Sequence, residues 1–154
     1  CPIHLLILGF KDNEYGKTLE RKVDFTDQKY KIHFTGKVNN VKDYLSISNL
    51  FILPTLDFKR KEGCPVALLE ALASGLNVLG SDVCGINDIL KNFPENLFQP
   101  GNVIDLITKI KIQLMNKDAH KKNSLLEHTI KNYDIFVEAK RHEDIYLKIL
   151  GKIE

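Results

Sequence analysis

Residues 62–85 decide the fold, and they read EGCPVALLEALASGLNVLGSDVCG. A glycine and a proline open this stretch, and an apolar run with small residues follows. Proline is favoured in the first turn of a helix and glycine just after its end. The run therefore predicts a helix that begins near Pro65 and stops at Ser74-Gly75. The apolar residues Leu76–Leu79 then predict a buried strand, which ends at Gly80.

The same alternation extends in both directions along the chain. Further strands are expected at Ile3–Leu8, Lys31–Thr35, Leu50–Leu53 and Leu97-Phe98, with helices at Tyr15–Val23, Val41–Ser48 and Ile86–Lys91. Continuous apolar runs such as Ile3–Leu8 are typical of strands buried on both faces, as in parallel sheets. Strands that alternate with helices predict an α/β fold, with a Rossmann-like parallel sheet and helices on both faces.

Helical spacing replaces this alternation after residue 102. Three helices are expected there. Their apolar positions are Val103, Ile104, Ile107, Ile110 and Leu114 in the first, Leu125, Leu126 and Ile130 in the second, and Phe136, Ile145, Tyr146 and Ile149 in the third. Neither a repeat nor a linker interrupts the 154 residues, so we expect a single domain over 1–154.

Composition excludes several classes of function. Lys and Arg number 22 and Asp and Glu 20, and a net charge of +2 does not indicate a nucleic-acid partner. Apolar runs stay far below the ~20 residues of a membrane span. The chain opens at Cys1-Pro2 without a basic segment, so no signal peptide is expected. The absent initiator Met suggests a piece of a longer chain.

The cysteines and histidines do not indicate a metal site. Three cysteines form neither a CxxC pair nor a spaced cluster, which indicates reduced thiols in a cytosolic protein. The five histidines lack metal-ligand spacing, so we expect ordinary surface or strand residues: His4, His33, His120, His128 and His142.

The start of the helix at Pro65 has the chemistry of an anion site. Unpaired N–H groups and the helix dipole attract a negative charge there, and Gly63 lets the backbone approach a ligand closely. Glu62 precedes the helix, and Glu70 lies in its second turn. Ionised carboxylates accept strong hydrogen bonds from paired hydroxyls, as on a ribose or a hexose. A nucleotide sugar requires both kinds of group.

These residues resemble the donor-site signature of retaining glycosyltransferases with the GT-B fold, in the glycosyl transferases group 1 family. The matching positions are Glu62, Gly63-Cys64-Pro65, Glu70, Gly75 and Gly85-Ile86. Further segments resemble the family in the same order: Leu5–Gly9, His33–Val38, Phe51–Thr55, Leu97–Ile107 and Tyr133–Leu150. The resemblance implies the C-terminal, donor-binding half of such an enzyme.

The resemblance also implies a role for each matching residue. Glu70 would accept hydrogen bonds from the ribose hydroxyls, and Glu62 would contact the transferred sugar as the catalytic residue. The other expected donor-binding positions are Gly63, Cys64, Pro65, Val66, Gly9, Gly36, Lys37, Val38 and Thr55. The full enzyme would transfer a hexose from a nucleoside diphosphate sugar to a glycan or lipid-linked acceptor with retention, without a metal or another cofactor.

Two parts of the family pattern are missing from this chain. In the family, an Arg and a Lys that bind the diphosphate lie on a strand–helix unit ahead of the strand that matches Leu5–Gly9. The acceptor domain precedes that unit. We therefore expect poor donor affinity and no transfer by the chain alone. The expected location is cytoplasmic. Lysines on the late helices indicate either a solvated face or weak attraction to anionic lipid at the inner face of the membrane.

Two alternatives remain at this point. A non-catalytic nucleotide-sugar-binding or scaffolding module could keep the same fold, although it would not need both glutamates. A GT-B-like epimerase or phosphorylase would lack the glutamate pair followed by the Gly75 and Gly85 loops. Neither a P-loop, a GxGxxG turn, a Gly-x-Ser-x-Gly elbow nor an Asp-x-Asp pair occurs in the sequence.

Overall fold

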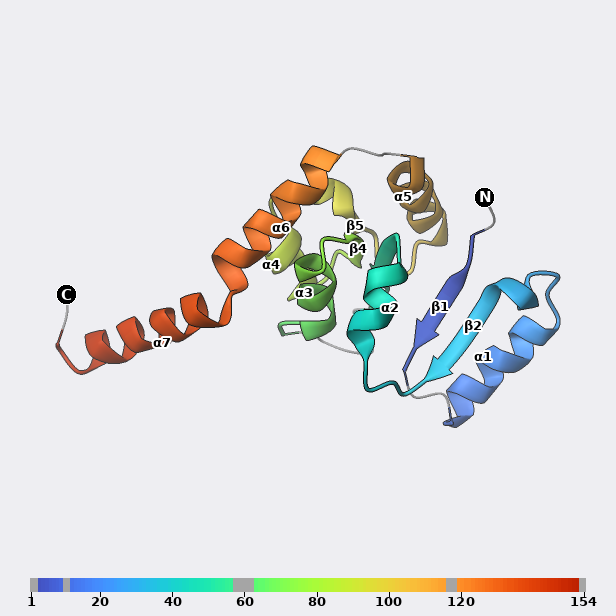
Figure 1. Ribbon diagram of the computed structural model, residues 1–154, viewed down its shortest axis with the longest axis horizontal. Helices are drawn as coiled ribbons and strands as arrows, with labels where there is room; N and C mark the ends of the chain where they lie inside the picture. The colour runs from blue at the N-terminus through green and yellow to red at the C-terminus, as the bar shows by residue number, and fades with distance from the viewer. Residues whose placement is uncertain (1–2, 10–11, 57–62, 116–118, 153–154) are drawn as a thin grey trace. The chain divides into compact units, whose positions relative to one another are not determined.

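A computed structural model describes residues 3–9, 12–56, 63–115 and 119–152 of the chain. Contacts divide the chain into two compact units, Cys1–Val41 and Lys42–Glu154. The elements in chain order are β1 (Leu5–Leu8), α1 (Glu14–Asp24), η1 (Lys29–Lys31), β2 (Ile32–Gly36), α2 (Val41–Ile47), β3 (Leu50–Leu53), α3 (Val66–Ala73), β4 (Asn77–Ser81), α4 (Ile86–Leu90), η2 (Pro94–Asn96), β5 (Leu97–Phe98), α5 (Val103–Met115), α6 (Ala119–Tyr133) and α7 (Ile135–Ile149) (Figure 1).

The first unit contains a two-stranded parallel sheet. Strand β1 pairs with β2 from Leu5 opposite Ile32 onward, with a register shift between Ile7 and Leu8. Helix α1 follows β1 and begins at Asn13, whose side chain accepts a hydrogen bond of 2.7 Å from the Gly16 N–H. An Asn at this position satisfies one of the unpaired N–H groups of the first turn.

The expectation that the first strand is buried on both faces is wrong. Leu5 is 47% exposed and Leu8 36% exposed, while Leu6 and Ile7 are half-buried. A sheet of two strands offers few neighbours, so its apolar side chains keep part of their surface in contact with solvent.

The second unit is organised around β4, the middle strand of a parallel sheet with the order β3-β4-β5. All five residues of β4 are buried. Helices α3 and α4 both pack against this strand. Their apolar faces form the core together with β4, and its fully buried large side chains include Leu68, Leu72, Leu79, Ile86, Ile89 and Leu90. The predicted parallel α/β, Rossmann-like fold is confirmed.

The side chain of Asn96 joins η2 to the central strand. It is fully buried, and its Nδ2 donates a hydrogen bond of 2.7 Å to the backbone oxygen of Val78. A buried amide needs such a partner, because leaving it unpaired in the core costs about 1–3 kcal/mol. This bond holds the connection between α4 and β5 against the sheet.

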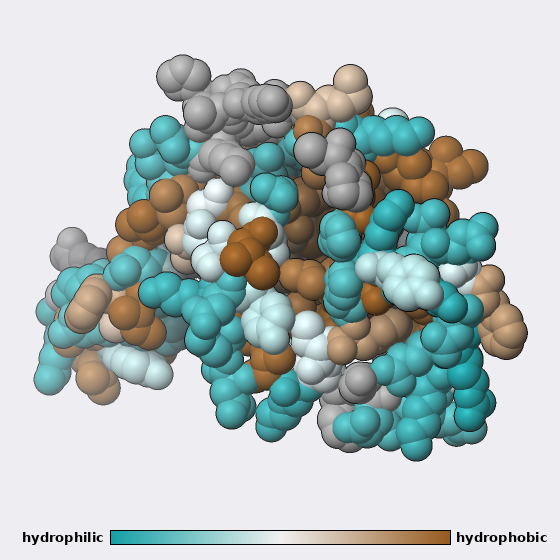
Figure 2. All heavy atoms as spheres, turned by 45° about the vertical axis from the view of Figure 1, so that its right-hand side comes forward, coloured by the Kyte–Doolittle hydropathy of each residue, from teal (hydrophilic) through white to brown (hydrophobic). Residues whose placement is uncertain are grey.

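The three last helices are present, but their burial differs from the expectation. Helix α6 packs against α3 and buries Leu125. In α5 the expected apolar positions are exposed except for the half-buried Ile110, with Ile104 79% exposed, whereas Gln113 is buried. In α7 the four expected apolar positions are also exposed, since the helix packs mainly on α6. Apolar side chains accordingly reach the surface among polar ones (Figure 2).

Candidate functional site

Helix α3 begins where the sequence places an anion site. Pro65 is the residue before the first helical residue, and its backbone is extended, with φ −71° and ψ 103°. Its oxygen accepts hydrogen bonds from the N–H groups of Leu68 (3.0 Å) and Leu69 (3.3 Å). Among the described residues, no side chain caps this helix start. The N–H groups of the first turn therefore remain suited to an anion.

Residues around this helix start differ in exposure. Gly63 and Cys64 are exposed, and Pro65 is buried. Helix α3 buries Leu68, Ala71 and Leu72 against the core. The N-terminal end of α3 is therefore open to solvent, while the face that carries these three residues packs against the core.

Glu70 lies on the exposed side of α3. Val66 is four residues earlier and also exposed, so the two side chains share one face, one turn apart. The predicted donor-binding residues Val66 and Glu70 are thus brought together. Glu62, the predicted catalytic residue, lies outside the described residues, and so does the basic segment Lys59-Arg60-Lys61.

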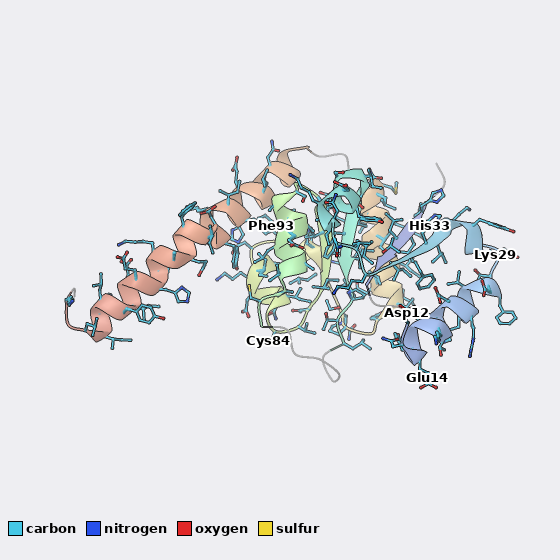
Figure 3. All side chains as sticks on the ribbon, turned by 60° about the horizontal axis from the view of Figure 1, so that its bottom comes forward. Asp12, Glu14, Lys29, His33, Cys84 and Phe93 are labelled. Atoms are coloured by element: carbon cyan, nitrogen blue, oxygen red, sulfur yellow. The ribbon has the colours of Figure 1, made fainter. Side chains whose placement is uncertain are left out.

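The loop after β4 forms a second part of this region. Gly85 has φ +83°, a conformation that favours glycine, and its N–H donates a hydrogen bond of 3.1 Å to Asp88 Oδ2. Cys84 Sγ lies 4.0 Å from the same carboxylate oxygen; Figure 3 labels Cys84. Asp88 thereby fixes the glycine loop at the start of α4. Cys84 is exposed and unbridged, as is Cys64.

Strands β3 and β4 are joined near their carboxyl ends. Ser81 is almost fully buried, and its Oγ donates a hydrogen bond of 3.4 Å to the backbone oxygen of Leu53. Thr55, a predicted donor-binding residue, follows this end of β3 and is half-buried. Ligands of parallel α/β sheets lie outside such carboxyl ends, so Thr55 occupies a suitable position for the expected role.

Tyr133 was missed by the sequence reasoning about the site. Burial raises the pKa of its phenol, and the negative charges of Cys64, Asp88 and Glu138 raise it further, while Arg141 lowers it. These neighbours come from the α3 start, α4 and α7. In the sequence, Tyr133 was only the first residue of a segment that resembles the family, Tyr133–Leu150. At neutral pH it is an uncharged hydrogen-bond donor among these groups.

The remaining predicted residues lie in the first unit. The N–H of Gly9 donates a hydrogen bond of 3.1 Å to the oxygen of Gly36, so the residue after β1 is joined to the last residue of β2. Gly9 has φ +142° and Gly36 φ +69°, which other residues rarely adopt. Lys37 is exposed and Val38 half-buried beside them. The structure therefore groups the predicted site residues into two sets, one in each unit.

A separate hollow of about 310 Å³ lies at the carboxyl ends of β4 and β5. Its polar lining residues are Asp82, Gln99, Asp105 and Lys109. These polar groups already have partners: Asp105 Oδ2 accepts from the Gln99 N–H (2.7 Å), and Asp82 Oδ1 accepts from Asn87 Nδ2 (3.1 Å). This use of Asp82 fits the turn role that is common for Asp. The described lining contains no residue of α3.

Metal ligation was not expected in this region. Over the described ranges, groups of three or more His, Cys, Asp and Glu side chains that could hold a metal ion do not occur. Nor does this part of the chain contain a helix that is both long and apolar enough to cross a membrane.

Comparison with known proteins gives the family. The sequence profile described as glycosyl transferases group 1 matches residues 2–132. The chain belongs to this family. The match includes both sets of predicted site residues.

The chain is similar to glycosyltransferases of polysaccharide biosynthesis. It is 25% identical over 145 residues to the capsular polysaccharide biosynthesis glycosyltransferase CapH of Staphylococcus aureus, covering 94% of this chain and 39% of that protein. It is 27% identical over 126 residues to the N,N'-diacetylbacillosaminyl-diphospho-undecaprenol alpha-1,3-N-acetylgalactosaminyltransferase of Campylobacter jejuni, covering 79% and 32%. The chain thus spans less than half the length of these relatives.

Solved structures confirm the fold. A crystal structure of a glycosyltransferase from Rickettsia africae superposes with a TM-score of 0.85 at 18% identity, covering 99% of this chain and 41% of that one. At this identity the likeness establishes the fold alone. It agrees with the predicted Rossmann-like half of a GT-B glycosyltransferase.

Proposed function

We propose that this chain binds the nucleotide-sugar donor of a group 1 glycosyltransferase, which adds a hexose to a growing polysaccharide or a lipid-linked glycan. The start of α3 is the observation that supports this most. It offers an uncapped helix end for the diphosphate, with Glu70 exposed one turn further along. Family membership supports the same conclusion.

Within this proposal, each group has a defined task. Glu70 accepts hydrogen bonds from the ribose, and the backbone of Gly63, Cys64, Pro65 and Val66 faces the diphosphate. Glu62 contacts the transferred sugar. In the first unit, Gly9 and Gly36–Val38 approach the base through their backbone. Catalysis then rests on positioning and on stabilising the departing diphosphate at the helix end, without a metal and with retention of configuration.

The acceptor is proposed from the relatives. The Campylobacter relative is named for transfer onto a diphospho-undecaprenol carrier, and the Staphylococcus relative for capsule biosynthesis. A lipid-linked or glycan acceptor bound by a separate N-terminal domain fits both names. The enzyme would then work in the cytoplasm, at the inner face of the membrane, and this chain alone would not transfer sugar.

The rival is a module that binds nucleotide sugars without catalysing transfer. Calorimetric titration of the chain with UDP, GDP and ADP tests the shared step, which is donor recognition. We expect one of the three to bind more tightly than the others, with weak affinity. If none binds at millimolar concentration, the donor-binding proposal is wrong for this chain.

Transfer itself needs a second assay. The chain is mixed with the matching nucleotide sugar and a polyprenyl-diphosphate-linked acceptor, and the product is followed by mass spectrometry. We expect donor binding without product. Product formed by the chain alone would show that the acceptor-binding part is not required, and would refute that half of the proposal.

A further inference from the structure

Two histidines that are 29 residues apart in sequence meet on the sheet of the first unit. His4 immediately precedes β1, and His33 is the second residue of β2; Figure 3 labels His33. His4 Nδ1 lies 3.0 Å from His33 Nε2. The ring centres are 5.3 Å apart and the ring planes differ by 14°, so the two nitrogens face each other between nearly parallel rings. Both residues are exposed.

The register of the sheet explains this pairing. Leu6 is the partner of His33 across the strands, and His4 lies two residues before Leu6, on the same face of β1. His4 is therefore the diagonal neighbour of His33, a distance that long or aromatic side chains can span. The pairing follows from the strand alignment rather than from a chance rotamer at the surface.

The facing nitrogens have the spacing of two ligands on one transition-metal ion. Imidazole nitrogens bind such ions at about 2.0–2.1 Å, so two nitrogens at right angles around an ion are about 3 Å apart. At the tetrahedral angle that Zn²⁺ adopts, the two nitrogens would have to be somewhat further apart. Tetragonal Cu²⁺ and octahedral Ni²⁺ place neighbouring ligands at right angles, and both favour nitrogen ligands.

We propose that His4 and His33 form a two-histidine site for a divalent transition metal, with preference for Cu²⁺ and Ni²⁺ over Zn²⁺. In the metal-free pair, one neutral imidazole donates its N–H to the other ring. On binding, that proton moves to the far nitrogen of the same ring, and the two exposed rings turn so that both lone pairs point at the ion; each imidazole stays neutral. Water completes the coordination.

A metal ion at this site would link the two strands of the sheet. A two-stranded sheet is marginally stable by itself, and an ion held by both strands stabilises the folded state because the unfolded chain does not bring the two rings together. The pair lies near the amino ends of the strands, whereas Gly9 and Gly36 lie at the carboxyl ends. The proposed metal is therefore structural and independent of donor binding.

Thermal unfolding with and without Ni²⁺ tests the proposal. We expect Ni²⁺ to raise the unfolding midpoint of the unaltered chain, and the rise to be lost in both His4→Gln and His33→Gln. His142→Gln is the matched control, since His142 is an exposed histidine on α7, and it should keep the full rise. The thiols of Cys64 and Cys84 are alkylated in all four proteins before the measurement, so that nickel bound by cysteine does not contribute to the rise.

Electron paramagnetic resonance with Cu²⁺, after alkylation of the thiols, gives a second measurement that does not depend on stability. We expect two coordinated imidazole nitrogens in the unaltered chain and one in either single variant. The proposal is overturned if the unaltered chain shows no midpoint rise, if the rise persists in a His4 or His33 variant, or if the copper spectrum shows only one imidazole.

Discussion

Replacing Gly80 by alanine should destabilise the second unit, because this position in β4 lies directly under α4. A Cβ atom at Gly80 would clash with Ile86 Cγ2 and would lie 3.2 Å from Leu90 Cδ1. Both neighbours are buried and cannot swing into solvent. Forcing a methyl group into a packed core costs about 1–3 kcal/mol. In a chain of this size, each kcal/mol lowers the midpoint of thermal unfolding by about 2–4 °C.

Urea unfolding followed by far-UV circular dichroism measures this effect. Gly63→Ala is the matched control, since a Cβ there would meet no atom within 4 Å, and its stability should stay within about 0.5 kcal/mol of the unaltered chain. Ile86→Ala removes the atom that clashes, so its cost should be smaller in the Gly80→Ala background than alone. Equal unfolding midpoints for Gly80→Ala and Gly63→Ala would refute the packing argument.

Three further predictions concern single side chains. Asn96→Ala removes the buried bond to Val78 and should cost about 1–3 kcal/mol in urea unfolding, whereas an unchanged midpoint would mean that the bond contributes nothing. Asp134→Ala removes the bond of 2.9 Å to the Phe136 N–H at the start of α7 and should cost about 1 kcal/mol, seen as lost helical signal on heating; an unaltered helical melt would count against this cap. The raised pKa of Tyr133 means that the folded chain keeps this phenol proton to higher pH than the unfolded chain, so its contribution to stability is complete below pH 10.0 and is lost as the pH rises through the folded pKa. Ultraviolet titration should show one tyrosine ionising later than free tyrosine, absent in Tyr133→Phe, and a spectrum identical in both proteins would contradict the assignment.

Sequence patterns predicted the elements well because their boundaries depend on local chemistry. The expected strands at Leu50–Leu53 and Leu97-Phe98 have the same bounds in the structure. Pro65, Gly75 and Gly85 lie at element boundaries because proline fixes φ and glycine accepts positive φ. These signals act within a few residues, so they can be read without knowledge of the tertiary contacts.

Burial was harder to predict, since it depends on which element lies opposite. The apolar positions of α5 show helical spacing, yet Ile104 is exposed and Gln113 buried. Spacing fixes which side chains share a face but not which face meets the sheet. For the same reason, the apolar run in β1 indicated a strand but not its exposure.

The same distinction holds for the candidate site: features of a single helix could be predicted, but contacts between segments distant in sequence could not. The motif identified the start of α3 and the exposed Glu70, because both depend on one helix and its flanks. Tyr133 could not be assigned to this region, since its neighbours Cys64 and Asp88 are distant in sequence. The pairing of His4 with His33 was missed for the same reason, because it depends on the register of two strands. The roles of Glu62 and of the glycine turns in the first unit stay predictions.

The central claim is that a nucleotide donor binds at the start of α3, and an NMR titration of the ¹⁵N-labelled chain with the preferred nucleoside diphosphate tests it most directly. We predict chemical-shift changes at the backbone N–H groups of Gly63, Cys64 and residues 66–70. Glu70→Ala should weaken binding about 10- to 150-fold, since it removes charge-assisted hydrogen bonds worth about 1.5–3 kcal/mol. Glu127→Ala, which alters an exposed glutamate of α6, should leave the affinity unchanged. Shifts confined to other parts of the chain, or equal affinity in Glu70→Ala and the unaltered chain, would contradict the account.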